Sequence, residues 1–183
     1  MIESAGQGDG AMTVTGGASQ VGRCLLARLS VQGRVGIAIQ HREPVPSYDG
    51  VCIVEGNLKG NSLPRLEAVS MVHIFAIWLI SENLPWLVHC GLKRLVCLSS
   101  TSIFSKEASF SKEASPSRYE RDLASRLATA EEDVLSICQK LGVDCAILRP
   151  TMIYGQGFDR NVSRAVKFIE RFGIYPAILH ADG

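Results

Sequence analysis

The chain has 183 residues, of which 46% are hydrophobic and 20% charged, and it contains 17 glycines. These values are typical of one globular domain and argue against a disordered, collagen-like or coiled-coil chain. Nineteen basic and 18 acidic residues leave a formal net charge of +1. No strong basic field is therefore available for a nucleic-acid backbone or an anionic membrane. We expect a small-molecule substrate or cofactor as the partner, with no nucleic acid and no membrane.

Signals for secretion, membrane insertion and metal binding are weak. Residues 1–10 are polar and glycine-rich, and the longest apolar run, residues 71–80, is too short to span a bilayer. None of the six cysteines forms a C-x-x-C pair, so we expect reduced thiols in a cytoplasmic protein. His73 and His89 have no second ligand at a recognisable spacing, so no metal is predicted.

Short apolar segments alternate with helical patterns along the chain. We predict strands at residues 11–15, 35–39, 51–54, 69–76, 94–100 and 143–148. We predict helices at residues 21–31, 78–90 (despite Pro85), 118–141 and 159–172. This alternation indicates an α/β fold with a mostly parallel sheet covered on both faces. The expected organisation is a flexible tail (1–10), one domain (11–155) and the start of a further region (156–183).

An exact repeat interrupts this pattern. The sequence FSKEAS occupies residues 104–109 and recurs at residues 110–115. Because the repeat is short, polar and placed between a strand and a helix, an enlarged surface loop is the favoured interpretation. Its position beside the expected site leaves a lid as the alternative.

A glycine-rich turn follows the first predicted strand. Residues 15–22, TGGASQVG, lie where a helix N-terminus could meet a phosphate. Gly16 permits a tight turn and Gly22 permits close packing of the helix on the strand. The amide groups and the dipole of the helix favour an anionic ligand at this point.

This turn resembles the TGxxGxxG motif of the short-chain dehydrogenase/reductase superfamily, in particular its extended and atypical branches related to nucleotide-sugar epimerases and dehydratases. Four later segments agree with the same family: VEGNL (54–58), VHIFA (72–76), LVCLSSTS (95–102) and LRPTMIYG (148–155). The last of these is the most specific motif. The resemblance implies a Rossmann-type doubly wound parallel sheet in three α/β/α layers.

The resemblance also implies a binding site for NAD(P). The residues that it places around the cofactor are Gly16, Ala18, Ser19, Gln20, Val21, Gly22, Arg42, Asn57, Ala76, Pro150, Thr151 and Ile153. Asn57 would lie near the adenine, and residues 150–153 near the nicotinamide. After the second strand the chain offers Gln40, His41 and Arg42 but no aspartate, which slightly favours NADP over NAD.

Three departures from the family pattern bear on activity. Ser19 replaces a glycine of the turn, and a glycine-like dihedral there would cost about 1 kcal/mol. Ser100 fits the family's catalytic serine, but no YxxxK follows it. Tyr119 and Arg126 share a helix face and permit a substitute pair, although a surface tyrosine and a solvated arginine are the favoured interpretation. The chain also ends where the family's substrate domain would continue.

The sequence therefore leaves two functions open, and Ser19 adds a third possibility, a remnant of the fold that binds nothing. The first is an oxidoreductase or epimerase that transfers hydride on a small carbonyl or sugar-nucleotide substrate; the second is a catalytically silent NAD(P)-binding sensor or scaffold. Arg149 could belong to the site or to an internal ion pair. Members of the family often form homodimers through the helices corresponding to residues 78–90 and 118–141, so a homodimer is one arrangement that the resemblance implies.

Overall fold

The computed structural model describes residues 10–59, 63–106, 118–151, 153–155 and 162–174. The chain divides into two compact units, Met1–Thr151 and Met152–Gly183. Most of the duplicated segment, from residue 107 onward, lies outside the described residues, as do the tail at 1–9 and the start of the last predicted helix at 159–161.

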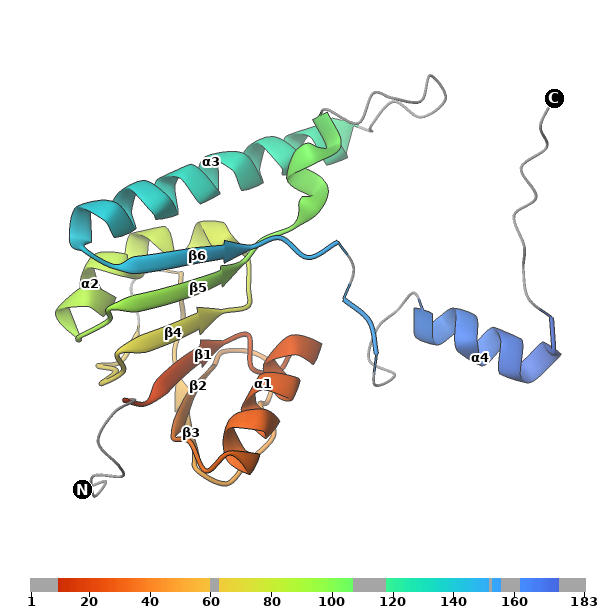
Figure 1. The fold of residues 1–183 in the computed structure, drawn as a ribbon, viewed down its shortest axis with the longest axis horizontal. Helices are drawn as coiled ribbons and strands as arrows, with labels where there is room; N and C mark the ends of the chain where they lie inside the picture. The colour runs from red at the N-terminus through yellow and green to blue at the C-terminus, as the bar shows by residue number, and fades with distance from the viewer. Residues whose placement is uncertain (1–9, 60–62, 107–117, 152, 156–161, 175–183) are drawn as a thin grey trace. The chain divides into compact units, whose positions relative to one another are not determined.

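The first unit contains a six-stranded sheet in the order β3-β2-β1-β4-β5-β6, and all neighbouring strands are parallel (Figure 1). The strands are β1 (Met12–Thr15), β2 (Gly36–Gln40), β3 (Val51–Glu55), β4 (Ser70–His73), β5 (Arg94–Leu98) and β6 (Asp144–Leu148). The order reverses between β1 and β4, as it does at the switch point of a doubly wound sheet. The predicted strands are confirmed, although β4 and β5 are shorter than predicted.

Helices cover the two faces of the sheet, which gives the predicted three layers (Figure 1). They are α1 (Gln20–Val31) on one face and α2 (Leu84–His89) and α3 (Arg118–Leu141) on the other. Leu26 of α1 packs with Val14 in one apolar cluster. Val134 of α3 packs with Met71 and Leu95 in a second cluster. Burial of these apolar side chains is the main source of stability for the fold.

The single helix predicted over residues 78–90 is wrong. The segment forms two 3-10 turns, Ile77–Leu79 and Ser81–Asn83, before α2 begins at Leu84. Pro85 lies in the first turn of α2, where its missing N–H leaves no bond unmade. The buried Asn83 side chain donates to the carbonyls of Leu58 and Leu79 and so ties the turns to the loop after β3.

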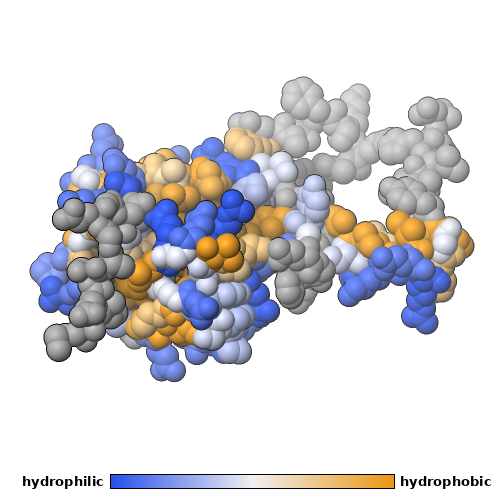
Figure 2. Space-filling view, turned by 60° about the horizontal axis from the view of Figure 1, so that its bottom comes forward, coloured by the Kyte–Doolittle hydropathy of each residue, from blue (hydrophilic) through white to orange (hydrophobic). Residues whose placement is uncertain are grey.

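The second unit contains α4 (Val162–Phe172), which agrees with the predicted helix over its described part. The Phe168 and Phe172 rings pack at 4.8 Å between centroids, one turn apart. Apolar side chains gather on one side of this helix and hydrophilic ones on the other (Figure 2). Within the described ranges, no helix combines the length and the apolar character needed to cross a membrane.

Candidate functional site

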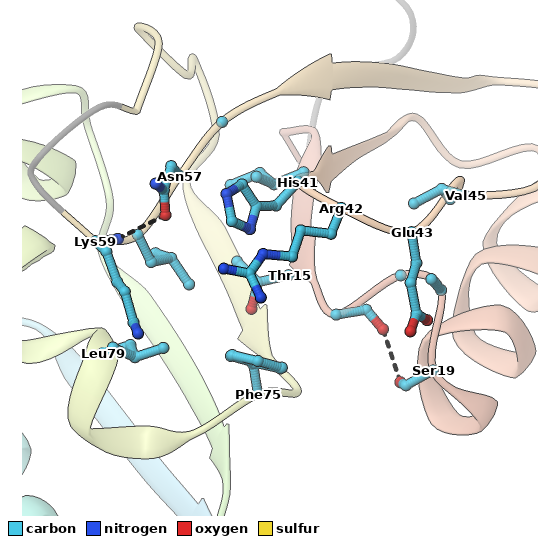
Figure 3. Close-up of a pocket in the computed structure, with 16 residues that line it drawn as sticks. Thr15, Ser19, His41, Arg42, Glu43, Val45, Asn57, Lys59, Phe75 and Leu79 are labelled. Atoms are coloured by element: carbon cyan, nitrogen blue, oxygen red, sulfur yellow. Dashed lines mark hydrogen bonds between the residues drawn. The ribbon is translucent and has the colours of Figure 1, made fainter.

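The carboxyl ends of β1, β2 and β3 border a cavity of about 390 Å³ (Figure 3). Residues 15–19 line it from the turn before α1, residues 39, 41–43 and 45 from β2 and the chain after it, and residues 56–59 from the chain after β3. Phe75 and Leu79 complete the lining. Ligands of doubly wound sheets bind in this kind of crevice, at the carboxyl ends of the strands beside the switch point.

The glycine turn is built by two very close backbone approaches. Gly16 has a φ of 72°, and a Cβ at this position would lie 2.6 Å from the carbonyl oxygen of Ile74. A Cβ on Gly22 would lie 2.2 Å from the carbonyl oxygen of Gly16. The two glycines therefore bring α1 against the end of β1, with the helix N-terminus beside the cavity.

Ser19 does not carry the strain considered from the sequence. Its φ of −69° and ψ of 163° are extended and open to any residue. It is the N-cap of α1: its hydroxyl accepts from the Gly22 amide at 3.1 Å and donates to the Gly16 carbonyl at 2.7 Å. Serine is a preferred N-cap, so this departure from the glycine pattern strengthens the turn. The Arg23 guanidinium adds a bond of 2.8 Å to the Ala18 carbonyl.

A buried histidine joins the ends of β1 and β4 behind the turn. His73 Nε2 lies 3.2 Å from the Ala76 carbonyl oxygen, which can only accept, so Nε2 carries the proton. His73 Nδ1 then accepts from the Thr15 hydroxyl at 2.7 Å. Burial lowers the pKa of His73 to about 4, against a smaller opposite effect of the Ala76 bond. This neutral histidine fixes Thr15 at the cavity wall.

The end of β2 presents charged side chains to the cavity. The Gln40 side-chain oxygen accepts from the Val45 amide at 2.8 Å, so Gln40 holds the intervening loop. His41, Arg42 and Glu43 lie on that loop and line the cavity. In Figure 3 the Arg42 side chain extends across the cavity toward Thr15 and Phe75.

The end of β3 contributes a second polar group of residues. Asn57 lines the cavity, and its side-chain oxygen accepts from the Lys59 amide at 2.9 Å. Lys59, Phe75 and Leu79 were not singled out from the sequence. Leu79 comes to the cavity because the segment after β4 is a 3-10 turn, which periodicity alone did not reveal.

The residues expected to take part in chemistry lie outside this cavity lining. The Ser100 hydroxyl accepts from the Ser102 amide at 3.2 Å and lies 3.0 Å from the Ser102 hydroxyl. Tyr119 is 75% exposed in the first turn of α3. The Arg126 guanidinium lies 3.8 Å from the ring centre of Trp78, so it packs on this indole.

The remaining predicted residues fall into three groups. Gln20, Val21 and Gly22 belong to the first turn of α1 and do not line the cavity. Ala76 and Pro150 present backbone carbonyls to His73 and to the Thr101 amide, respectively, and the side chain of Thr151 is exposed. Ile153 belongs to the second unit and is 43% exposed.

For Arg149 the structure selects the internal ion pair. Its Nε donates to both carboxylate oxygens of Glu131, at 3.1 and 2.9 Å. Glu131 is 2% exposed, and the pair joins α3 to the end of β6. Hydrogen bonding to Glu131 raises the pKa of Arg149. No set of three His, Cys, Asp or Glu residues in the described part of the chain could hold a metal ion.

Comparison with known proteins identifies the family. The model of the NAD dependent epimerase/dehydratase family matches residues 79–174, which is slightly more than half of the chain. No curated protein sequence matches the chain.

Solved structures with the same fold agree with this match. One is MoeE5 in complex with UDP-glucuronic acid and NAD, with 22% identity over 86% of this chain and 60% of that chain and a TM-score of 0.64. A second is TunA, an NAD dependent NDP-hexosamine 5,6-dehydratase, with 16% identity, coverage of 95% and 65%, and a TM-score of 0.69.

A third is UDP-N-acetylglucosamine 4-epimerase from Bacillus cereus, with 20% identity, coverage of 85% and 65%, and a TM-score of 0.64. The chain thus spans less than two thirds of each of these three proteins. These sequence identities are low, so the structural similarity shows the fold alone. The family model, in contrast, matches the amino-acid sequence of residues 79–174. The chain belongs to the NAD dependent epimerase/dehydratase family.

Proposed function

We propose that the chain binds an NAD(P) dinucleotide in the cavity at the ends of β1, β2 and β3. The observation that carries this proposal is the glycine turn, where Gly16 and Gly22 bring the N-terminus of α1 to the cavity. A helix N-terminus offers amide groups and a positive dipole end to a pyrophosphate. The cavity volume of about 390 Å³ is in the range of small-molecule sites.

NADP is the favoured form of the cofactor. Arg42 lines the cavity at the position after β2 where a 2′-phosphate would be recognised, and no aspartate stands there to accept from a 2′-hydroxyl. A planar guanidinium suits bidentate contact with a phosphate. Glu43 lines the same cavity and is the side chain that would serve NAD instead.

The reaction that this site supports is hydride transfer on a carbonyl or sugar-nucleotide substrate. Bound NAD(P) would supply the hydride chemistry. The Ser100 hydroxyl would donate to the reacting oxygen, since its oxygen already accepts from the Ser102 amide. MoeE5 is in complex with UDP-glucuronic acid, TunA is an NDP-hexosamine 5,6-dehydratase, and the Bacillus cereus protein is a UDP-N-acetylglucosamine 4-epimerase, which supports this substrate class.

One observation favours a second candidate, a catalytically silent NAD(P)-binding sensor or scaffold. Tyr119, the proposed substitute for the missing YxxxK tyrosine, is 75% exposed at the start of α3. Arg126, its suggested partner, contacts Trp78. Loss of a positioned proton donor commonly costs 10²- to 10⁴-fold in rate.

A homodimer through α2 and α3 remains a prediction, which light scattering would check.

Binding is tested by titrating the protein with NADPH and NADH in a calorimeter, with thermal unfolding as a second measurement. A ligand that binds only the native state raises the unfolding temperature as its concentration increases. We expect both cofactors to bind, NADPH more tightly. The Gly16→Val variant, with circular dichroism as a check of folding, should not bind. Absence of binding by the unmodified protein at millimolar cofactor would refute the proposal.

Activity is tested separately with NADPH and a panel of carbonyl compounds, and with NAD and nucleotide sugars. If Ser100→Ala loses turnover but keeps its affinity for NADPH, the result supports the proposed hydride-transfer enzyme. Binding without turnover, on a panel that a full-length relative converts, supports the silent module.

A further inference from the structure

A second cation, Lys59, enters the cavity from the side opposite the glycine turn. It follows β3 after Gly56, Asn57 and Leu58, and its amide donates to the Asn57 side chain at 2.9 Å. This bond closes a local turn and holds the backbone of Lys59 at the end of β3. In Figure 3 Lys59 extends alongside Leu79, whereas Ser19 lies on the other side of the cavity.

Positively charged side chains outnumber carboxylates among the residues that line the cavity. Lys59 and Arg42 are two cations among the lining residues, and Glu43 is the single carboxylate there. Over residues 10–59, 63–106, 118–151, 153–155 and 162–174, neither cationic side chain has a hydrogen bond or an ion pair. Two unpaired cations that share one cavity suit an anionic ligand between them.

The pyrophosphate of a dinucleotide does not account for Lys59. It would be held by the turn at Gly16 and Ser19, whose amide groups and helix dipole supply the positive end. Lys59 lies away from Ser19, on the far side of the Arg42 side chain (Figure 3). A dinucleotide whose pyrophosphate lies at the turn would reach these two cations with its adenosine end, because Lys59 lies beside Asn57, which is expected near the adenine.

We propose that Lys59 is a specificity-determining residue that, with Arg42, binds the phosphate on the ribose of an NADP-type dinucleotide. This inference rests on the proposed cofactor site and assigns Lys59 to it. Arg42 supplies a rigid planar donor, and Lys59 supplies a mobile point charge from the opposite side. Lys59 discriminates between the cofactors because NAD has no anion at this position.

The experiment compares dissociation constants for NADPH and NADH by calorimetry in the full chain and in Lys59→Met. Methionine keeps an unbranched apolar stem and removes the charge. We expect NADPH binding to weaken about tenfold, because a charge-assisted contact is lost. NADH binding should change by less than about twofold, within the usual scatter for a surface substitution. Lys93→Met, at another exposed lysine, is the matched control and should change neither constant.

Two further variants keep the test independent of folding. Lys59→Arg should retain the preference for NADPH, and Lys59→Glu should reverse it toward NADH. The salt dependence of NADPH binding should become shallower in Lys59→Met, because one contact to a phosphate is removed.

The outcomes separate this inference from the proposed function. If Lys59→Met weakens NADPH and NADH equally, Lys59 contacts a part common to both cofactors and the inference is wrong. If it weakens neither, the inference is also wrong, while the cofactor site stands. If the unmodified protein binds neither cofactor, the proposed function fails and this inference fails with it.

Discussion

Protonation of His73 should control how the fold responds to acid. In the native protein Nε2 donates to the Ala76 carbonyl and Nδ1 accepts from Thr15, so the neutral ring satisfies both partners. Burial lowers the pKa of His73 from its ordinary value of 6.5 to about 4. The unfolded chain therefore binds this proton more readily, and stability falls as the pH drops from about 6.5 to 4. Below pH 4 this residue removes no further stability.

The size of the effect follows from the pKa difference. A change from 6.5 to about 4 corresponds to about 3 kcal/mol in the free energy of unfolding. That is a large part of the 5 to 15 kcal/mol expected for a domain. The assay is urea unfolding followed by circular dichroism between pH 7.5 and 4, for the unmodified protein and for His73→Gln.

The variant should be less stable at pH 7.5, because glutamine does not reproduce both bonds, but its stability should fall less steeply with acid. Parallel curves for the two proteins would show that His73 is not the titrating group and would refute this reasoning. A curve that steepens in the variant would do the same.

Five other substitutions test the turn and the ion pair. Gly22→Ala should unfold the turn or lower stability by several kcal/mol, because its Cβ would meet the Gly16 carbonyl at 2.2 Å; a stable variant in urea unfolding contradicts this. Ser19→Ala should cost about 1 kcal/mol through loss of the N-cap, and Ser19→Gly less, by the same assay. Arg149→Met should cost about 3 kcal/mol, since it leaves the buried Glu131 carboxylate unpaired. Glu131→Gln should cost less than Arg149→Met, and the reverse order in thermal unfolding would contradict the assignment.

The strands and the main helices were predictable because each is set by a local pattern. The strands of the parallel sheet are short continuous apolar runs, and α3 has a clear helical period closed by Gly142. The break in the predicted helix at 78–90 depended on Asn83, whose side chain bonds to Leu58, 25 residues earlier. Such a long-range bond leaves no periodic signal in the sequence.

The site was predictable in part, for a similar reason. The turn at Gly16 follows a motif, so its place beside the cavity could be expected. The energetic cost expected for Ser19 depended on a glycine-like backbone angle. The observed φ of −69° is open to any residue, so this cost does not arise. Arg149 had two open interpretations, because its partner Glu131 is 18 residues away on another element. Lys59 carries no motif and is recognised only from the cavity that it lines.

The cavity and the family match are nearly independent lines of evidence for a dinucleotide site. The family model covers residues 79–174, whereas every residue that lines the cavity lies between Thr15 and Leu79. The match therefore does not include the glycine turn, and the turn geometry owes nothing to the match. Ser100 lies in the matched segment and outside the cavity lining, so the proposed cofactor cavity and the proposed catalytic serine belong to different parts of the chain. A substitution at Ser100 can abolish turnover while cofactor affinity is still measured. The same protein can therefore be tested both as an enzyme and as a silent cofactor-binding module.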